Sequence, residues 1–295
     1  MLKRITTNLK NGKHVILTGP PGTGKSKLAK EICQKYVGKN YNMVTATSDW
    51  STFDTIGGYR PNRNGNLNFN SGVFLDCFKK DKQPGNDWLI IDEINRADID
   101  KAFGSLFSAL TGDPITLSFK TNNNKNIRIK PQEFEKIMPE EHLYVIPEDW
   151  RIIATMNTFD KTSLYEMSYA FMRRFAFIPV SIPQEINPTL VKNYLDCWGI
   201  ENYQYVEQVS KLWNKINNTR KIGQKKKKNI YSYLLDNYND YSSVIISYVL
   251  PQFEGVRKNE LYSFINELKE LGFITDQILD TIQNFVDDYF RLGGQ

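Results

Sequence analysis

Apolar and polar positions follow two different patterns along the chain, and the change between them divides it into two parts. Up to about residue 183, short apolar runs predict buried strands, with helical spacing between them. These runs lie at 14–18, 43–46, 88–91, 151–156 and 176–180. Beyond residue 184 the strand signals stop, and helical spacing covers stretches such as 189–197, 203–217 and 259–271. We therefore predict an α/β domain over residues 1–183 and a helical domain over residues 184–295.

Two segments of the first part predict β-hairpins. Residues 59–70 are rich in Asn, Arg and Gly, which favours an exposed loop or hairpin. Residues 115–119 and 127–129 alternate apolar and polar positions, and an asparagine-rich turn lies between them. The rest is predicted as helix at 72–78 and 98–110 and as a charged connector at 131–149.

A glycine-rich motif lies between the first predicted strand and the helix that follows it. Residues 19–26 fit the pattern G-x-x-x-x-G-K-[ST] in full. Its glycines allow backbone N–H groups to point inward, and the helix N-terminus adds partial positive charge. Lys25 is expected to reach the β- and γ-phosphates of a nucleotide, and the Ser26 hydroxyl to bind Mg²⁺. The nucleotide-binding residues are predicted to be Pro21, Gly22, Thr23, Gly24, Lys25, Ser26 and Lys27.

Polar side chains end two of the predicted strands. Asp92 and Glu93 follow the run 88–91, and Asn157 follows the run 151–156. The carboxyl ends of strands in an open parallel sheet face the ligand crevice. Asp92 could therefore bind Mg²⁺, Glu93 could polarise water, and Asn157 could hold that water or the γ-phosphate. The alternatives are that the carboxylates cap the next helix and that Asn157 is a turn residue.

Two adjacent arginines precede the last predicted strand. Arg173 and Arg174 could be ordinary surface charge. Phosphoryl transfer, however, gains much from an arginine near the γ-phosphate, and a neighbouring subunit can supply it.

Composition limits the cellular compartments and the kinds of binding site that we expect for this protein. The net charge of +5 permits contact with nucleic acid without requiring it. The lysine run 225–228 is predicted as a solvated loop, with nucleic-acid contact as its alternative. Three widely spaced cysteines match no metal site and favour a reducing compartment, so we expect a cytoplasmic protein. Neither a signal peptide nor a membrane-length apolar stretch is evident, and two histidines disfavour a histidine-based metal or triad site.

The order of these motifs resembles that of an AAA+ ATPase. The resemblance is closer to the McrB branch, the motor of modification-dependent restriction systems. It covers residues 10 to 182 well and the helical part weakly. Three strings carry it: Trp88-Leu89-Ile90-Ile91-Asp92-Glu93-Ile94-Asn95-Arg96-Ala97-Asp98, Met156-Asn157-Thr158-Phe159-Asp160 and Ser168-Tyr169-Ala170-Phe171-Met172-Arg173-Arg174-Phe175.

This resemblance implies a P-loop AAA+ module with a parallel five-stranded sheet in the order 5-1-4-3-2, β-hairpin insertions and a C-terminal helical lid. It implies Mg²⁺-dependent hydrolysis, a homo-oligomeric ring expected to be a hexamer, and a McrC-like nuclease partner. DNA is then contacted through the assembly, in restriction and phage defence. The family's phosphate-binding roles map to Gly22, Gly24, Lys25 and Ser26, its Walker B roles to Asp92 and Glu93, its sensor role to Asn157, and its trans-acting roles to Arg173 and Arg174.

The resemblance favours GTP as substrate, with ATP as the alternative, because many McrB-type motors resemble GTPases. Asp160 is a tempting guanine-reading residue, but geometry argues against that role. Asn157 is expected beside the γ-phosphate, and the base lies on the order of 10 Å away, beyond the reach of a side chain three residues on. We expect Asp160 to orient an incoming arginine instead. Base contacts are expected from residues 1–13 and from the lid.

Two departures from the family pattern stand out. Restriction motors usually carry an N-terminal domain that reads modified DNA, and we expect no such domain ahead of the phosphate loop in this sequence. We expect either a truncated motor or one whose targeting lies in another subunit. The lid shows no clear second sensor arginine, and Arg220 and Arg257 remain the candidates.

Two other functions fit the same motifs. A MoxR-like chaperone ATPase that remodels protein partners would use the same catalytic residues. A non-enzymatic, nucleotide-gated scaffold is the third class, but it has less need of Glu93, Asn157 and Arg173 together.

Overall fold

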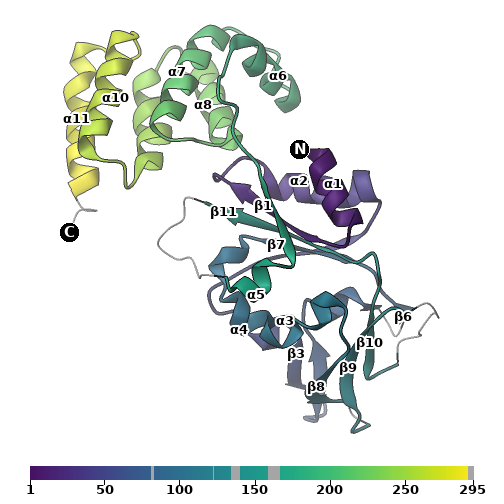
Figure 1. The fold of residues 1–295 in the computed structure, drawn as a ribbon. Helices are drawn as coiled ribbons and strands as arrows, with labels where there is room; N and C mark the ends of the chain where they lie inside the picture. The colour runs from purple at the N-terminus through teal and green to yellow at the C-terminus, as the bar shows by residue number, and fades with distance from the viewer. Residues whose placement is uncertain (81–82, 122, 134–139, 159–166, 292–295) are drawn as a thin grey trace. The chain divides into compact units, whose positions relative to one another are not determined.

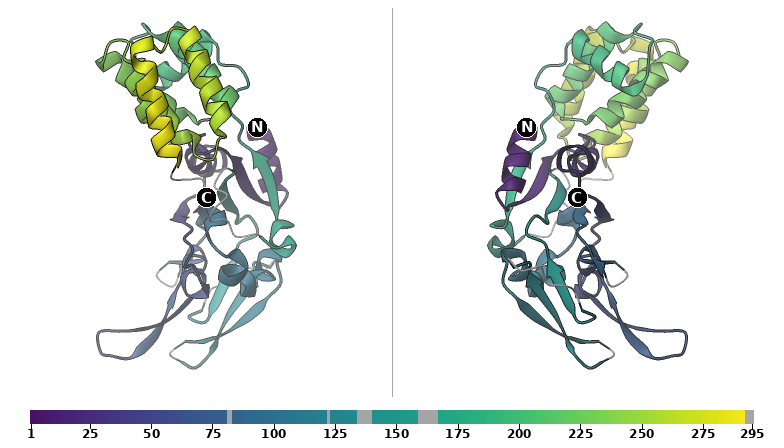
Figure 2. Two further views of the ribbon diagram at one scale, coloured as in Figure 1. Left: turned by 90° about the vertical axis from the view of Figure 1, so that its left-hand side faces the viewer. Right: turned by 90° about the vertical axis from the view of Figure 1, so that its right-hand side faces the viewer.

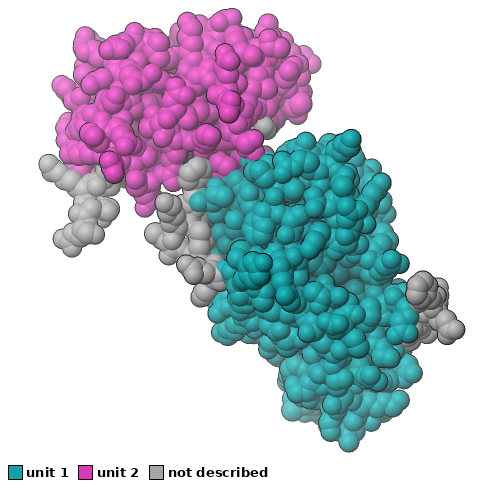
Figure 3. Space-filling view, in the orientation of Figure 1, with its two compact units in different colours: residues 1–19, 25–180 teal, residues 20–24, 181–295 magenta. Residues whose placement is uncertain are grey.

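The computed structural model describes residues 1–295 apart from 81–82, 122, 134–139, 159–166 and 292–295. The chain divides into two compact units, one of residues 1–19 and 25–180 and the other of residues 20–24 and 181–295 (Figure 3). Each unit has its own buried apolar core.

A five-stranded sheet forms the centre of the first unit (Figure 1). All its strand pairs are parallel, so the predicted α/β fold with a parallel five-stranded sheet is confirmed. The strand order is β12-β1-β11-β7-β2, which reads 5-1-4-3-2 when the five strands are counted along the chain. The strands are β1 (His14–Gly19), β2 (Tyr41–Thr45), β7 (Trp88–Asp92), β11 (Ile152–Asn157) and β12 (Phe175–Pro179).

The central strands are apolar in consecutive positions because both faces of the sheet are covered. Leu89, Ile90 and Ile91 of β7 are all fully buried, as expected for a parallel sheet with helices packed against it. Helix α2 (Lys25–Glu31), which continues as a π-helix over Ile32–Val37, contacts β1, β7 and β11. Helix α1 (Leu2–Lys10) contacts β1 and β12 and buries Ile5 and Leu9.

Two β-hairpins extend from this unit, as predicted (Figure 2). Strands β3 (Gly57–Pro61) and β4 (Leu67–Ser71) form the first, and β8 (Ile115–Lys120) and β9 (Asn126–Pro131) form the second. The hairpins are joined where the Lys120 backbone N–H donates to the Tyr59 hydroxyl at 2.8 Å. The first unit also contains α3 (Thr52–Thr55) and the short strands β5 (Lys79–Lys80) and β6 (Gln83–Pro84).

Three segments differ from the sequence prediction. The segment 131–149 is not only a connector, because it contains β10 (Leu143–Ile146), which pairs parallel to β9. The helix expected over 98–110 is shortened to α4 (Ile99–Phe103) followed by 3₁₀ turns at Gly104–Leu106 and Ala109–Thr111. A glycine inside the apolar pattern explains the break, since glycine disfavours a continuous helix. The helix expected at 72–78 is a single 3₁₀ turn at Leu75–Cys77.

All the regular secondary structure in the described part of the second unit is helical. Its first helix begins where Asn187 accepts a hydrogen bond from the Leu190 N–H at 2.8 Å, with Pro188 at the first helical position. Across the described residues of the chain, no helix combines the length and apolar character needed to cross a membrane. The helices are α6 (Pro188–Trp198), α7 (Val206–Thr219), α8 (Gln224–Asp236), α9 (Tyr241–Val244), α10 (Lys258–Glu270) and α11 (Asp276–Arg291), with a π-helix at Ile245–Val249 and a 3₁₀ turn at Leu250–Phe253.

The lysine run 225–228 lies in α8 and not in a solvated loop, and Lys227 is buried. Helical spacing puts Lys227 on the same face as Ile230, Tyr231 and Leu234, which are buried in the core. Its ammonium nitrogen lies 5.5 Å from the centre of the Trp213 ring and has no hydrogen-bond partner among the described residues. Burial lowers the pKa of Lys227 to about 8.

We predict that Lys227→Met stabilises the protein. The pKa of Lys227 is lower in the folded chain, about 8, than its ordinary 10.5. Below pH 8 the buried charge on Lys227 therefore lowers the stability of the folded chain by its full amount. This loss of stability disappears as the pH rises from about 8 to 10.5. Urea unfolding at pH 7 should show a gain of about 1–3 kcal/mol for Lys227→Met, and the gain should shrink by pH 10. Lys211→Met, at an exposed position of α7, should show neither effect, and a destabilised or pH-insensitive Lys227→Met variant would contradict the argument.

Candidate active site

The phosphate loop leaves β1 and enters α2 through backbone conformations that favour glycine. Gly19, Gly22 and Gly24 have φ of 151°, 75° and 85°. A Cβ atom at Gly19 would lie 2.4 Å from the carbonyl oxygen of Val180, so a side chain there would clash with backbone. The Thr23 hydroxyl donates to the Pro20 carbonyl at 3.0 Å and closes the turn.

Lys25 is held against the start of this loop. Its Nζ donates to the Gly19 carbonyl at 2.9 Å, and the residue is 5% exposed. Burial lowers the pKa of Lys25 to about 8, although the negative charges of Asp92 and Glu93 act in the opposite direction. Bound phosphates would add negative charge beside this ammonium and favour its protonated form.

Asp92, at the end of β7, accepts two hydroxyl hydrogen bonds on the same oxygen. Ser26 Oγ donates to Asp92 Oδ1 at 2.6 Å, and Thr155 Oγ1 donates to it at 2.5 Å. These groups fit Mg²⁺, which is bound through hard oxygen ligands, one or two carboxylates and substrate phosphates. Among the described residues, no cluster of three or more His, Cys, Asp or Glu offers a metal cage of another kind. Ser26 and Asp92 would hold the ion.

Glu93 is fixed in an unusual backbone conformation. Its φ of 54° and ψ of 47° lie in the left-handed region. Non-glycine residues rarely adopt this conformation, and those that do are often found at functional sites. The Glu93 N–H donates to Thr155 Oγ1 at 3.0 Å. Its carboxylate accepts from Asn157 Nδ2 at 2.9 Å and pairs with Arg96 Nε at 2.6 Å. The carboxylate is therefore oriented from two sides.

The alternative role of these carboxylates, capping the next helix, belongs to another residue. Asp98 is the N-cap of α4 and accepts from the Lys101 N–H at 3.0 Å. Glu93 makes no side-chain capping bond to the 3₁₀ turn that follows it.

Asn157 lies at the end of β11, where it pairs in register with Gly19 of β1. Its carbonyl accepts from Asn95 Nδ2 at 3.1 Å, and Asn95 is 2% exposed. The ends of β1, β7 and β11 thus bring Lys25, Ser26, Asp92, Glu93 and Asn157 together. Asp160 lies outside the described residues.

The two arginines have different surroundings. Arg174 is 8% exposed, its Nε donates to the Phe107 carbonyl at 2.9 Å, and its guanidinium also contacts the Ala170 carbonyl. Its guanidinium carbon lies 5.3 Å from the centre of the Phe107 ring. Arg173 is exposed, and its carbonyl accepts from Lys13 Nζ at 3.1 Å. Arg174 is therefore engaged within its own chain, whereas Arg173 faces solvent.

The candidate lid arginines both lie beside helix ends in the second unit. Arg220 follows α7 and donates to the Glu254 carbonyl, and Arg257 is the residue before α10.

Sequence reasoning missed Thr155, Asn95 and Arg96, although they organise the site. Thr155 is 1% exposed and precedes Asn157 by two residues, so their side chains point to the same face of the sheet. The sequence did hold a signal for Thr155: it is a hydroxyl residue within an apolar strand and lies on the same face as the Asn157 amide at the end of that strand. Asn95 and Arg96 follow Glu93 in a turn, where the sequence gives no comparable signal.

A phosphate loop beside two strand-end carboxylates defines the protein as a P-loop nucleoside triphosphatase. The sequence matches the AAA domain family, dynein-related subfamily, over residues 14–175, which is more than half of the chain. The chain belongs to this family, and the expected AAA+ membership and nucleoside-triphosphate hydrolysis are confirmed.

Comparison with curated proteins gave no match. Among solved structures, the chain is similar to a provisionally assigned ATPase from Cytophaga hutchinsonii, at 15% identity and a TM-score of 0.43. The similarity covers 96% of this chain and 79% of the other.

We predict that Glu93→Gln binds nucleotide but hydrolyses it about 10²–10⁴-fold more slowly, because the amide cannot polarise water as a carboxylate does. Nucleotide affinity and kcat, measured separately, check this expectation. Glu207→Gln makes the same chemical change at an exposed position of α7 and should leave both values unchanged. Wild-type turnover in Glu93→Gln would remove Glu93 from the chemistry.

Proposed function

We propose that this chain is the motor subunit of a ring in which Arg173 completes the active site of the neighbouring subunit. The observation that carries the proposal is the contrast between two adjacent arginines. Arg174 is held by the Phe107 and Ala170 carbonyls of its own chain, and Arg173 is exposed. Only Arg173 is available to a neighbour without the loss of internal contacts.

The segment before Arg173 is anchored so that this residue has a defined direction. The Ser168 N–H and hydroxyl donate to Asp100 at 3.0 and 2.5 Å. Ser168 also caps α5 (Tyr169–Met172) by accepting from the Phe171 N–H at 3.2 Å. Tyr169, four residues before Arg173, is 79% exposed, and aromatic residues and arginines are both enriched at interfaces.

A shared site also accounts for the charge that hydrolysis requires. Lys25 lies at the phosphate loop, whereas the nearby Arg96 already pairs with Glu93. An arginine finger stabilises the negative charge that spreads over the transferring phosphoryl group, and it is worth about 10³–10⁵ in rate.

We further propose, from the resemblance to the McrB branch, that the ring prefers GTP over ATP, needs Mg²⁺ and drives a McrC-like nuclease in DNA restriction. In this proposal DNA is reached through the assembly, and Asp160 orients the incoming arginine. A MoxR-like chaperone would share Lys25, Glu93 and Arg173, so the partner and the nucleotide distinguish the two functions.

We predict that Arg173→Ala alone and Lys25→Ala alone hydrolyse slowly, and that their mixture regains activity. In a mixed ring, the intact phosphate loop of one variant meets the intact arginine of the other. Size-exclusion chromatography would confirm that both variants assemble. Melting temperatures give a second contrast: Arg174→Ala should lower Tm by several degrees because it removes buried contacts, and Arg173→Ala should not. Assembled variants that show no recovery on mixing would exclude the shared site.

The same assay, run with GTP and ATP in parallel and with and without a nuclease subunit, separates the two candidate functions. The restriction motor predicts faster GTP turnover and stimulation by the nuclease. Turnover of ATP alone, without stimulation by a nuclease, would favour the chaperone function and leave the shared active site unaffected.

A further inference from the structure

The positive charge of the chain is concentrated in its first segment. Residues 1–48 contain nine lysines and arginines and one carboxylate, Glu31, which gives them a net charge of +8. The whole chain carries +5, so the remaining residues have a net charge of −3. Such an uneven distribution indicates a partner of high negative charge more directly than the total charge does.

The exposed cations of this segment lie on two neighbouring helices. Helix α1 contacts the π-helix that continues α2, and both α1 and α2 contact β1 (Figure 1). Ile5 of α1 and Ala29 of α2 are fully buried in the core, so the charged sides of both helices face solvent. We call this surface the N-terminal basic face, and its exposed cations are Lys3, Arg4, Lys10, Lys13, Lys27, Lys30 and Lys35.

Carboxylates balance little of this charge. Glu31 pairs with Lys35 at 3.7 Å, and Asp149 pairs with Lys39 at 2.5 Å. Within the described part of the chain, five cations of the face make no salt bridge with a carboxylate: Lys3, Arg4, Lys10, Lys27 and Lys30. Their charges remain available to a partner.

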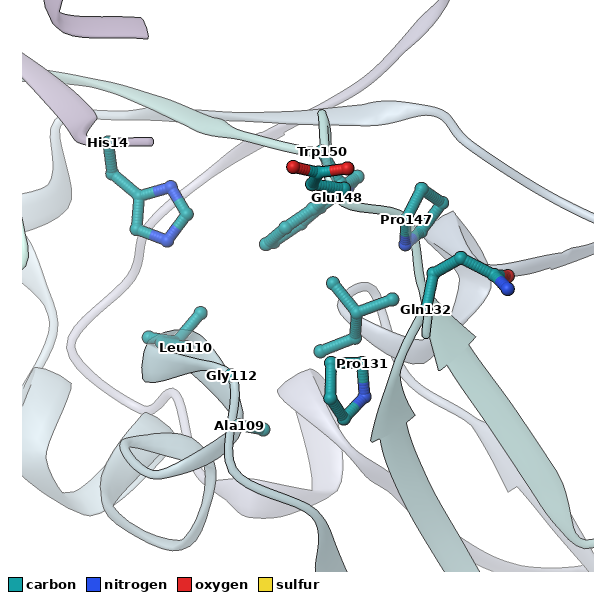
Figure 4. A pocket seen from close by; sticks show the side chains of 10 residues that line it. His14, Ala109, Leu110, Gly112, Pro131, Gln132, Pro147, Glu148 and Trp150 are labelled. Atoms are coloured by element: carbon teal, nitrogen blue, oxygen red, sulfur yellow. The ribbon is translucent and has the colours of Figure 1, made fainter. Parts of the chain in front are cut away.

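Glu148 lies at the border of the face, beside the end of α1. Arg151 connects the two, because its Nε donates to the Leu9 carbonyl at 2.9 Å and its Nη1 to the Glu148 carbonyl at 2.7 Å. The Glu148 side chain lines a pocket together with His14 and Trp150 (Figure 4). The positive charge of Arg151 opposes that of the Glu148 carboxylate, so this border adds little negative charge to the face.

The side chains of the face suit phosphate groups better than base edges. Six of its seven exposed cations are lysines. A lysine ammonium acts as a point charge on a phosphate, whereas the commonest specific contact to a base is a bidentate arginine. Exposed polar side chains that can donate to phosphate oxygens lie among these cations in the sequence: Thr7, Asn11, Gln34 and Tyr36.

An anionic membrane fits this face less well. A helix that binds in the membrane interface buries its apolar side at the boundary of the acyl chains. That side of α1 is already used, because Ile5 and Leu9 are 0% and 3% exposed in the core. The large apolar or aromatic side chains that residues 1–48 expose are Met1 and Tyr36, too few for an inserting stripe.

We propose that the N-terminal basic face binds the phosphate backbone of double-helical DNA without sequence preference. The lysine run 225–228 is less suited to this role, because Lys227 is buried. DNA binding at this face rests on the proposed function, in which DNA is reached through the assembly, and gives that role a surface. It is measured without hydrolysis, so failure of DNA binding and failure of the proposed motor function are observed separately.

The test is a fluorescence anisotropy titration of a labelled duplex of about 20 base pairs with the full chain, without nucleotide, from about 50 to 200 mM NaCl. Replacement of Lys3, Lys10 and Lys30 by glutamine should weaken binding about tenfold or more at the lowest salt. The slope of log K against log salt should fall in magnitude by about 2–3, since each lost phosphate contact removes about 0.9. Two duplexes of unrelated sequence should give the same result.

A charge-matched control replaces three exposed lysines of the second unit by glutamine: Lys192, Lys211 and Lys221. This control should bind DNA as the wild type does. An equal loss in both variants would show that binding follows the net charge of the chain and would overturn the assignment to this face. Arginine at positions 3, 10 and 30 keeps the charge and should retain binding. Lys27 stays unchanged because it belongs to the predicted nucleotide-binding residues.

Three further outcomes would contradict the proposal. They are no DNA binding at the lowest salt, wild-type binding by the glutamine variant, and tighter binding to vesicles with about 30% phosphatidylserine than to DNA. Melting temperatures show whether the glutamine variant is folded, as expected for changes at exposed positions. If it is not, the double variant Lys3→Gln and Lys10→Gln decides, with a salt slope reduced by about 1–2.

Discussion

A single hydroxyl, Thr155 Oγ1, joins the two strands that carry the candidate catalytic groups. It donates to Asp92 Oδ1 at 2.5 Å and accepts from the Glu93 N–H at 3.0 Å. The first bond fixes the carboxylate that would bind Mg²⁺. The second supports the left-handed backbone at Glu93, whose φ is 54°. Such a conformation persists only where surrounding contacts hold it. The placement of both carboxylates therefore depends on a buried group at the end of β11, a strand that neither of them belongs to.

The parallel sheet makes this dependence effective. Because β7 lies beside β11 and β11 beside β1, the carboxylates, the Asn157 amide and the phosphate loop all lie at the carboxyl ends of the strands. Asn157, at the end of β11, donates a hydrogen bond to the Glu93 carboxylate, and Lys25 donates one to the Gly19 carbonyl. Among the described residues at these strand ends, Lys25 is the cation at the phosphate loop, and Arg96 pairs with Glu93. The exposed position of Arg173 supports our proposal that a neighbouring subunit supplies a second cation for the phosphates.

The sheet and most of the site could be predicted from the sequence because their signals are local. Runs such as 88–91 report burial on both faces of a strand, and the spacing of the glycines reports the phosphate loop. Strand β10 was missed because its apolar run, Leu143–Ile146, is four residues long and lies in a segment that is otherwise charged. Four consecutive lysines gave no sign in the sequence that Lys227 is buried on its helix. Adjacent arginines look alike in a sequence, and only the structure shows that Arg174 binds the Phe107 and Ala170 carbonyls while Arg173 is exposed.

The placement of both carboxylates depends on the Thr155 hydroxyl, so the most direct measurement compares kcat for Thr155→Val and Thr155→Ser. Valine keeps the shape and loses both hydrogen bonds, and serine keeps the hydroxyl and loses a methyl group. Turnover should fall by about 10²-fold in Thr155→Val, as expected when catalytic groups lose their alignment. It should stay near the wild-type value in Thr155→Ser, with nucleotide still bound by both. Equal turnover in Thr155→Val and the wild type would show that the carboxylates are placed without this hydroxyl and would contradict the account.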